Sequence, residues 1–158
     1  MPSSPQIALS TGDEMKISKQ VQEALETNRP VVALESTIIS HGLPYPRNIA
    51  AAKEFEQQLI DAGVVPATIG IIGGVPTIGL SQDELEQIAS EGTAKSSVRD
   101  LPIIAAKGIN GATTVAATAY LAAKAGIRVF ANGVLGGVHQ GADETFDESA
   151  DLTTLATC

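Results

Sequence analysis

A single acidic side chain, Glu35, follows four apolar residues in the segment Val31–Ile39, which has the pattern of a buried β-strand. Burial disfavours the charged form of a carboxyl group, so such an acid needs a partner or has a raised pKa. A carboxyl group that stays protonated near neutral pH can act as a general acid. The alternative is an ordinary glutamate at a strand end that points into solvent.

Two glycine-containing loops could bring backbone close to a ligand. The loop Lys107–Thr114 is expected to lead from a strand into a helix, whose free N–H groups and positive dipole end favour a phosphate or sugar hydroxyl. The loop Gly133–Gly141 follows another predicted strand and contains His139, which could be a ligand, an acid or a hydrogen-bonded structural residue. Ordinary helix capping and a plain crossover turn are the respective alternatives.

The segment 141–151 is acidic and has no basic residue; its acids are Asp143, Glu144, Asp147, Glu148 and Asp151. Hard oxygen ligands at short spacing suit Mg²⁺ or Mn²⁺, which keep several waters. A solvated surface loop is the alternative. Two cations, Lys95 and Arg99, precede a further predicted strand and could either meet an anionic substrate or lie exposed.

The composition restricts the class of protein. A chain of 158 residues with 44% hydrophobic and 3% aromatic residues is expected to form one domain with an aliphatic core. Its net charge of −8 leaves no cationic face for a nucleic acid polymer or an anionic membrane. The single cysteine, Cys158, excludes an intrachain disulfide, and there is neither a signal peptide pattern nor a membrane-spanning run. We therefore expect a cytoplasmic protein.

The chain alternates apolar strand-like runs with helical patterns, which predicts a layered α-β-α fold with a largely parallel central sheet, incomplete in this chain. Residues 1–14 are expected to be a disordered lead-in. Helices are predicted at 15–28, 47–62, 81–89 and 112–125, and strands at 31–39, 67–72, 101–106 and 127–131. No helix is expected after the last of these strands.

Six sequence blocks occur together in a fixed order: VALESTIISHG (32–42), PATIGIIGG (66–74), RDLP (99–102), NGATTVA (110–116), GGVH (136–139) and TFDESADL (145–152). In this order the blocks resemble the pseudouridine-5′-phosphate glycosidase family. The resemblance covers residues 15–158 and corresponds to the N-terminal part of the family's domain.

The resemblance implies reversible cleavage of the C–C glycosidic bond of pseudouridine 5′-phosphate, giving uracil and ribose 5-phosphate. It implies a divalent cation, typically Mn²⁺, and a homotrimer. By resemblance Glu35 is the proton donor and Asp147 binds the metal. The residues that it places at the substrate are Lys95, Val115, His139, Ser149, Ala150 and Asp151.

The family also uses a nucleophilic lysine that forms an imine with the opened ribose, and this lysine lies beyond the segment 149–152. The sequence ends before such a lysine, so we expect the 158-residue chain to lack the nucleophile. Asn132, Val134 and Gln140 stand where the family has Thr, Gly and Arg. The alternative function is a shortened, non-catalytic relative that binds sugar phosphates or joins oligomers.

Overall fold

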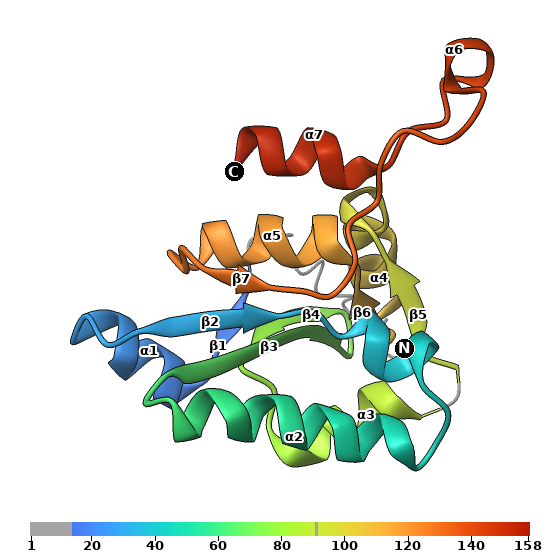
Figure 1. The fold of residues 1–158 in the computed structure, drawn as a ribbon. Helices are drawn as coiled ribbons and strands as arrows, with labels where there is room; N and C mark the ends of the chain where they lie inside the picture. Colours follow the sequence, from blue (N-terminus) through green and yellow to red (C-terminus); the bar gives the residue numbers. More distant parts are fainter. Residues whose placement is uncertain (1–13, 91) are drawn as a thin grey trace, which may run out of the picture.

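The computed structural model describes residues 14–90 and 92–158. They form a mixed sheet with helices on both faces (Figure 1). The main path of the sheet is β1 (Lys16–Ile17), β4 (Val75–Ile78), β3 (Val65–Ile72), β2 (Val31–Leu34) and β7 (Phe130–Ala131); β5 (Ala94–Ser96) pairs with β6 (Gly111–Thr113), which pairs with β3. Most pairings are parallel, but β4 and β6 run antiparallel to β3. The predicted α/β class with a largely parallel sheet is confirmed.

The helices are α1 (Lys19–Glu26), α2 (Arg47–Asp61), α3 (Gln82–Ala89), α4 (Leu101–Lys107), α5 (Val115–Lys124), α6 (Ala142–Thr145) and α7 (Ala150–Thr157). Helices α2 and α3 cover one face of the sheet, α5 covers the other, and α7 lies outside α5 (Figure 1). Within residues 14–90 and 92–158, no helix has the length and apolar character needed to span a membrane. The predicted lead-in at 1–14 lies outside the described residues, apart from Glu14.

The central strand β3 is buried on both faces, as its apolar sequence predicts. Its residues Val65, Ala67 and Ile69 pack in a cluster with α1 and α5. On the opposite face, a Cβ atom at Gly70 would lie 3.1 Å from Leu80 and 3.2 Å from Ile88, which is part of α3. The absence of a side chain at Gly70 therefore lets α3 approach the sheet closely.

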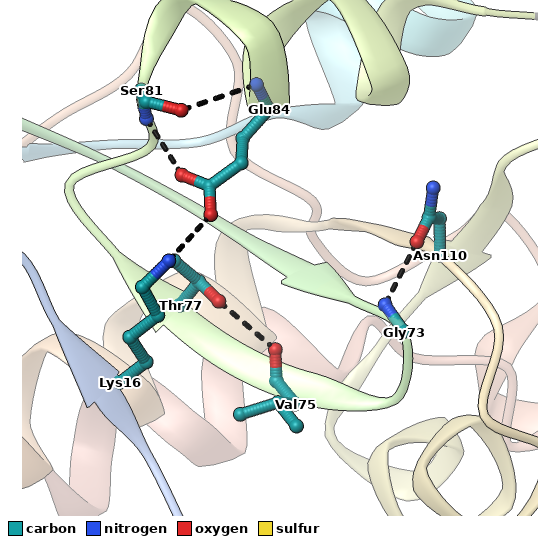
Figure 2. Close-up of polar contacts among 7 residues, drawn as sticks. All are labelled: Lys16, Gly73, Val75, Thr77, Ser81, Glu84 and Asn110. Atoms are coloured by element: carbon teal, nitrogen blue, oxygen red, sulfur yellow. Dashed lines mark hydrogen bonds and ion pairs between the residues drawn. The ribbon is translucent and has the colours of Figure 1, made fainter.

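Capping residues define the start of α3 and the end of α2. The hydroxyl of Ser81 accepts from the amide of Glu84, and the Glu84 carboxylate accepts from the Ser81 amide at 2.8 Å, so α3 begins with a capping box. The same carboxylate binds Lys16 of β1 at 2.7 Å, as Figure 2 shows. Gly63 follows α2 with a φ of +76°, the left-handed conformation that ends helices.

The predicted strand at 101–106 is wrong, because this segment is the helix α4. The Asp100 carboxylate accepts from the amide of Ser97 just before the helix, Pro102 occupies its first turn, and Gly108 ends it in the left-handed conformation. These are helix signals at both ends of the segment. A short apolar run does not distinguish strand from buried helix, and here the flanking residues decide.

Other boundaries also differ from the prediction. The strand predicted at 31–39 ends at Leu34, and a π-helix over Ile38–Gly42 follows, with Ile39 buried against α3.

The predicted helix 15–28 begins only at Lys19, after β1, and the predicted helix 112–125 begins at Val115, after β6. The strand predicted at 127–131 is confined to 130–131. The expectation of no later helix is wrong, since α7 packs along α5.

The strands β2 and β6 meet end to end along the same edge of β3. Strand β2 runs parallel to the first half of β3, whereas β6 runs antiparallel to Gly70 and Ile71, so their carboxyl ends face each other. The buried hydroxyl of Ser36 accepts from the Thr113 amide at 2.9 Å, and the Thr113 hydroxyl donates to the Ile69 carbonyl at 2.7 Å. This junction places Glu35 beside the start of α5.

Candidate active site

A cavity of about 460 Å³ opens at the junction of β2 and β6. It gathers side chains from segments far apart in the sequence. The predicted site residues that line it are Glu35, Lys95, Val115, Ser149, Ala150 and Asp151. Six of the eight predicted site residues thus share one cavity, and the other two, His139 and Asp147, do not line it.

Glu35 is half-buried at the end of β2, with its side chain at the cavity wall. Burial raises the pKa of its carboxyl group above the ordinary value, the negative charge of Asp151 raises it further, and the nearby Lys95 ammonium partly opposes both effects. The direction of this shift agrees with the predicted raised pKa, and the half-buried position favours it over a glutamate that points fully into solvent. A carboxyl group with this shift can hold a proton for transfer to a ligand in the cavity.

Asp151 is buried, with 9% of its surface exposed, and joins three segments around the cavity. Its Oδ1 accepts from the amide of Ala116 in the first turn of α5, and its Oδ2 accepts from the amide of Gly136, each at 2.9 Å. A carboxylate at a helix N-terminus is stabilised by free amides and the helix dipole. Asp151 therefore fixes the glycine-rich loop and α7 against α5.

The remaining predicted substrate residues lie around these two acids. Lys95 is exposed on β5, Val115 is the buried first residue of α5, and Ser149 caps α7 through a hydrogen bond from the Asp151 amide at 3.2 Å. Ala150 lies at the start of α7. A cation, a hydroxyl and an apolar surface therefore face the same space as Glu35.

His139 and Asp147 instead pair with each other on an exposed loop. Their side chains approach within 3.0 Å, between Nδ1 and Oδ2, and 58% and 67% of their surfaces are exposed. The loop that carries them, with α6 at its tip, projects from the body of the molecule (Figure 1). In residues 14–90 and 92–158, no group of three His, Cys, Asp or Glu side chains is arranged to hold a metal ion. The metal role of Asp147 stays a prediction.

The two predicted ligand loops contribute less than expected. In the first loop, Gly108 ends α4, and the Asn110 side chain accepts from the amide of Gly73 at 2.8 Å, as Figure 2 shows. Only Thr114 and Val115 from this region line the cavity, and the helix start that was predicted to bind phosphate already holds the Asp151 carboxylate. From the second loop, Val134 and Gly136 reach the cavity.

Sequence reasoning did not single out five residues of the cavity wall, namely Thr37, Ile38, His41, Gly42 and Ser97, and it included Thr114, Val134 and Gly136 only as members of the two predicted ligand loops. Thr37 is notable because, among the described residues, its Oγ1 is buried without a hydrogen-bond partner. Such an atom calls for a partner from outside the chain, such as a water or a ligand. Their positions in the sequence could have identified three of these residues, because Thr37, Ser97 and Thr114 each follow the end of a strand that reaches this junction.

Residues 20–158 match the family described as indigoidine synthase A like protein, and the chain belongs to this family. Curated relatives carry the name pseudouridine-5′-phosphate glycosidase. The relative from Saccharopolyspora erythraea is 64% identical over 141 residues, and that from Escherichia coli K12 is 58% identical over 144 residues. The resemblance predicted from the sequence blocks is confirmed.

Solved structures agree with this assignment. The prealnumycin C-glycosynthase AlnA, in complex with ribulose 5-phosphate, is 41% identical with a TM-score of 0.80, and an indigoidine synthase A-like protein from Thermotoga maritima is 35% identical with the same score. The alignments cover 89% and 90% of this chain for the two curated relatives, and 90% and 92% for the two structures. They cover only 46% or 47% of those proteins, so the chain spans about half their length.

Proposed function

We propose that this chain carries the acid-bearing part of a C-glycosidase site that acts on pseudouridine 5′-phosphate. The observation that carries the proposal is the shared cavity of Glu35 and Lys95, in which Glu35 has a raised pKa. The names of the curated relatives supply the substrate class, and the C-glycosynthase supports C-glycosyl chemistry.

In this proposal Glu35 protonates C5 of uracil as the bond from C5 to C1′ of the ribose breaks. The bonding electron pair stays with C5, and water supplies the oxygen that ends at C1′ of ribose 5-phosphate. The Lys95 ammonium attracts the phosphate or the developing charge, and the hydroxyls of Thr37, Ser149 and Thr114 offer hydrogen bonds to the sugar. Val115 provides apolar surface against which the base can lie.

A divalent cation, Mn²⁺ by family resemblance, would be held by Asp147, with His139 beside it. The Asp147 carboxylate supplies an oxygen donor, which suits Mn²⁺, whereas an imidazole nitrogen is more typical of zinc, copper, iron or nickel sites. Because neither side chain lines the cavity that contains Glu35, no step of the proposed reaction is routed through the cation. In residues 14–90 and 92–158, no group of three His, Cys, Asp or Glu side chains is arranged to hold a metal ion, so its remaining ligands would be waters. A homotrimer, also expected from the family, would bring three such chains together.

Among the described residues that line the cavity, Lys95 is the only lysine. We propose that the nucleophilic lysine comes from the part of the family's fold that this chain does not span. The isolated chain would then bind ribose 5-phosphate without forming an imine, which agrees with the alternative of a non-catalytic sugar-phosphate binder.

The test joins residues 1–158 to the part of the Saccharopolyspora erythraea relative that they do not cover, and measures uracil release from pseudouridine 5′-phosphate. We expect Glu35→Gln to lower the rate by ~100-fold or more, as for removal of a general acid. The exposed Glu54→Gln serves as the control and should leave the rate unchanged. Full activity of the Glu35→Gln protein, or release of phosphate instead of uracil, would overturn the proposal.

Borohydride treatment with ribose 5-phosphate tests the isolated chain. We expect no covalent adduct on residues 1–158 and a stable adduct on the joined protein. Calorimetric binding of ribose 5-phosphate should weaken in Lys95→Met and persist in Lys107→Met, because Lys107 ends α4 and does not line the cavity. An adduct on the isolated chain would show that its own lysines suffice.

A further inference from the structure

The structure points to the open edge of β7 as a docking surface, and we propose that it receives a β-strand with flanking helices, homologous to the part of the relatives that this chain does not span. The surface consists of the β7 edge itself and one hollow on each face of the sheet beside it. The inference concerns assembly and does not depend on the catalytic proposal.

Among residues 14–90 and 92–158, strand β7 ends the main path of the sheet, with β2 on one side and no strand on the other. The amide of Ala33 donates to the carbonyl of Val129, so the backbone of Val129 faces β2. Successive residues of a strand direct their N–H and C=O groups to alternate sides, and those of Phe130 therefore point away from β2. An added strand would use these groups, as in other cases of strand addition.

Both faces of the sheet are hollowed beside this edge. On the α2 face, a cavity of about 490 Å³ is lined largely by apolar groups, among them Leu34, Phe55, Leu59 and Ala131. On the α5 face, a second hollow of about 450 Å³ is lined by residues that include Ala119, Ala122, Ile127, Phe130 and Leu155. A strand flanked by two helices would fill the edge and both hollows at once.

Large apolar side chains are exposed around the same edge. Phe55 is 39% exposed, Val129 is 56% exposed and Leu155 is 43% exposed. Large exposed apolar side chains gathered beside an edge and two hollows are typical of an interaction site.

The opposite end of the sheet differs in kind. There β1 is two residues long, as β7 is, but Lys16 on β1 binds the Glu84 carboxylate (Figure 2). A lysine on an edge strand discourages the addition of another strand. The β7 edge combines exposed Val129 with the two apolar hollows instead. Of the two ends of the main path, β7 is therefore the one at which we expect the sheet to be extended.

The length of the relatives indicates which polypeptide would bind at the β7 edge. This chain aligns with 46% of the Saccharopolyspora erythraea relative and with 46% of the C-glycosynthase structure, whose fold it shares with a TM-score of 0.80. More than half of each of these proteins therefore lies outside the aligned region. A polypeptide of that size can supply the strand and both helices, whereas a small ligand would fill one hollow only.

The experiment compares thermal unfolding of the isolated chain with that of the joined protein described above. We expect Phe55→Asp and Leu155→Asp to change the Tm of the isolated chain little, and to lower the Tm of the joined protein by roughly 5 °C or more, because burial there forces a charge into apolar surroundings. The control Ile103→Asp, at a 53% exposed site on α4 that lines neither hollow, should have the same small effect in both proteins.

Equal Tm changes in the isolated and joined proteins would overturn the proposal. Light scattering of the isolated chain tests the other occupant, a second copy of itself. If the isolated chain associates with itself, and Phe55→Asp and Leu155→Asp but not Ile103→Asp abolish this association, the surface is assigned to a second copy. That result would also overturn the proposal. None of these measurements requires catalysis, so loss of the proposed activity and loss of the proposed interface are distinguishable.

Discussion

The carboxylates of Glu35 and Asp151 line the same cavity, and the charge of Asp151 adds to the burial that raises the pKa of Glu35. Asp151 differs from Glu35 in its hydrogen bonds, because it accepts from two backbone amides. Asp151 is thus fixed in position by two backbone amides, while burial and the charge of Asp151 raise the pKa of its neighbour Glu35.

Replacing Glu35 should make the protein more stable at neutral pH while removing the proposed acid. The pKa of Glu35 is higher in the folded protein than in the unfolded chain. Its favourable contribution to the free energy of unfolding is therefore fully present below the unfolded pKa and is lost as the pH rises through the folded pKa. The free energy of unfolding of Glu35→Gln minus that of the unmodified chain should therefore increase between about pH 4 and pH 8. Urea unfolding at several pH values measures this difference.

Glu54→Gln is the matched control, since Glu54 is exposed on α2. The free energy of unfolding of Glu54→Gln minus that of the unmodified chain should vary little over the same pH range. Glu56 also has a raised pKa, through burial, but it is present in every variant and cancels from the comparison. If the free energy of unfolding of Glu35→Gln, relative to the unmodified chain, fell with rising pH, the prediction would be contradicted.

Removing the Asp151 side chain should destabilise the site strongly. Asp151→Ala leaves the amides of Ala116 and Gly136 without their carboxylate partner, and hydrogen bonds to charged groups contribute roughly 1.5–3 kcal/mol each. We expect a loss of about 2–4 kcal/mol in the free energy of unfolding. Asp143→Ala, at an exposed position in α6, should change it by less than about 0.5 kcal/mol. Equal effects of the two substitutions would show that Asp151 does not fasten the loop.

The glycine-rich loop offers a paired test at adjacent positions. A Cβ atom at Gly136 would lie 2.6 Å from Cβ of Ser149 and 2.9 Å from Oδ2 of Asp151, whereas a Cβ at Gly137 would meet nothing within 4 Å. Gly136→Ala should therefore displace Ser149 and Asp151 and weaken binding of ribose 5-phosphate by ~10-fold or more, and Gly137→Ala should not. Calorimetric titration of both variants measures this; similar affinities would place the ligand away from the loop.

The sequence predicted the chemistry of this site better than its assembly. The apolar neighbours of Glu35 indicated a raised pKa directly, because desolvation acts locally. The partner of Asp151 was missed, because the Ala116 amide belongs to a helix start 35 residues away, and only folding brings the two together. The run 101–106 was assigned to a strand on apolar content alone, although Pro102 and Gly108 at its ends indicate a helix.

The junction between β2 and β6 holds Glu35 in position, and Ser36 is the residue that joins the two strands. Its side chain is fully buried and accepts from the Thr113 amide, and it lies 3.3 Å from the Thr113 hydroxyl. Ser36→Ala leaves a buried amide unsatisfied, which should cost about 1–3 kcal/mol in the free energy of unfolding. Thr153→Ala, exposed on α7, is the control and should stay within about 0.5 kcal/mol of the unmodified chain.

Chemical denaturation of both variants gives the comparison. Amide hydrogen exchange adds a local measurement, since the Thr113 amide should lose protection in Ser36→Ala more than amides in the middle of β3. Unchanged protection at Thr113 would mean that the two strand ends stay together without the Ser36 hydroxyl. The position of Glu35 would then depend on the pairing of β2 with β3 alone.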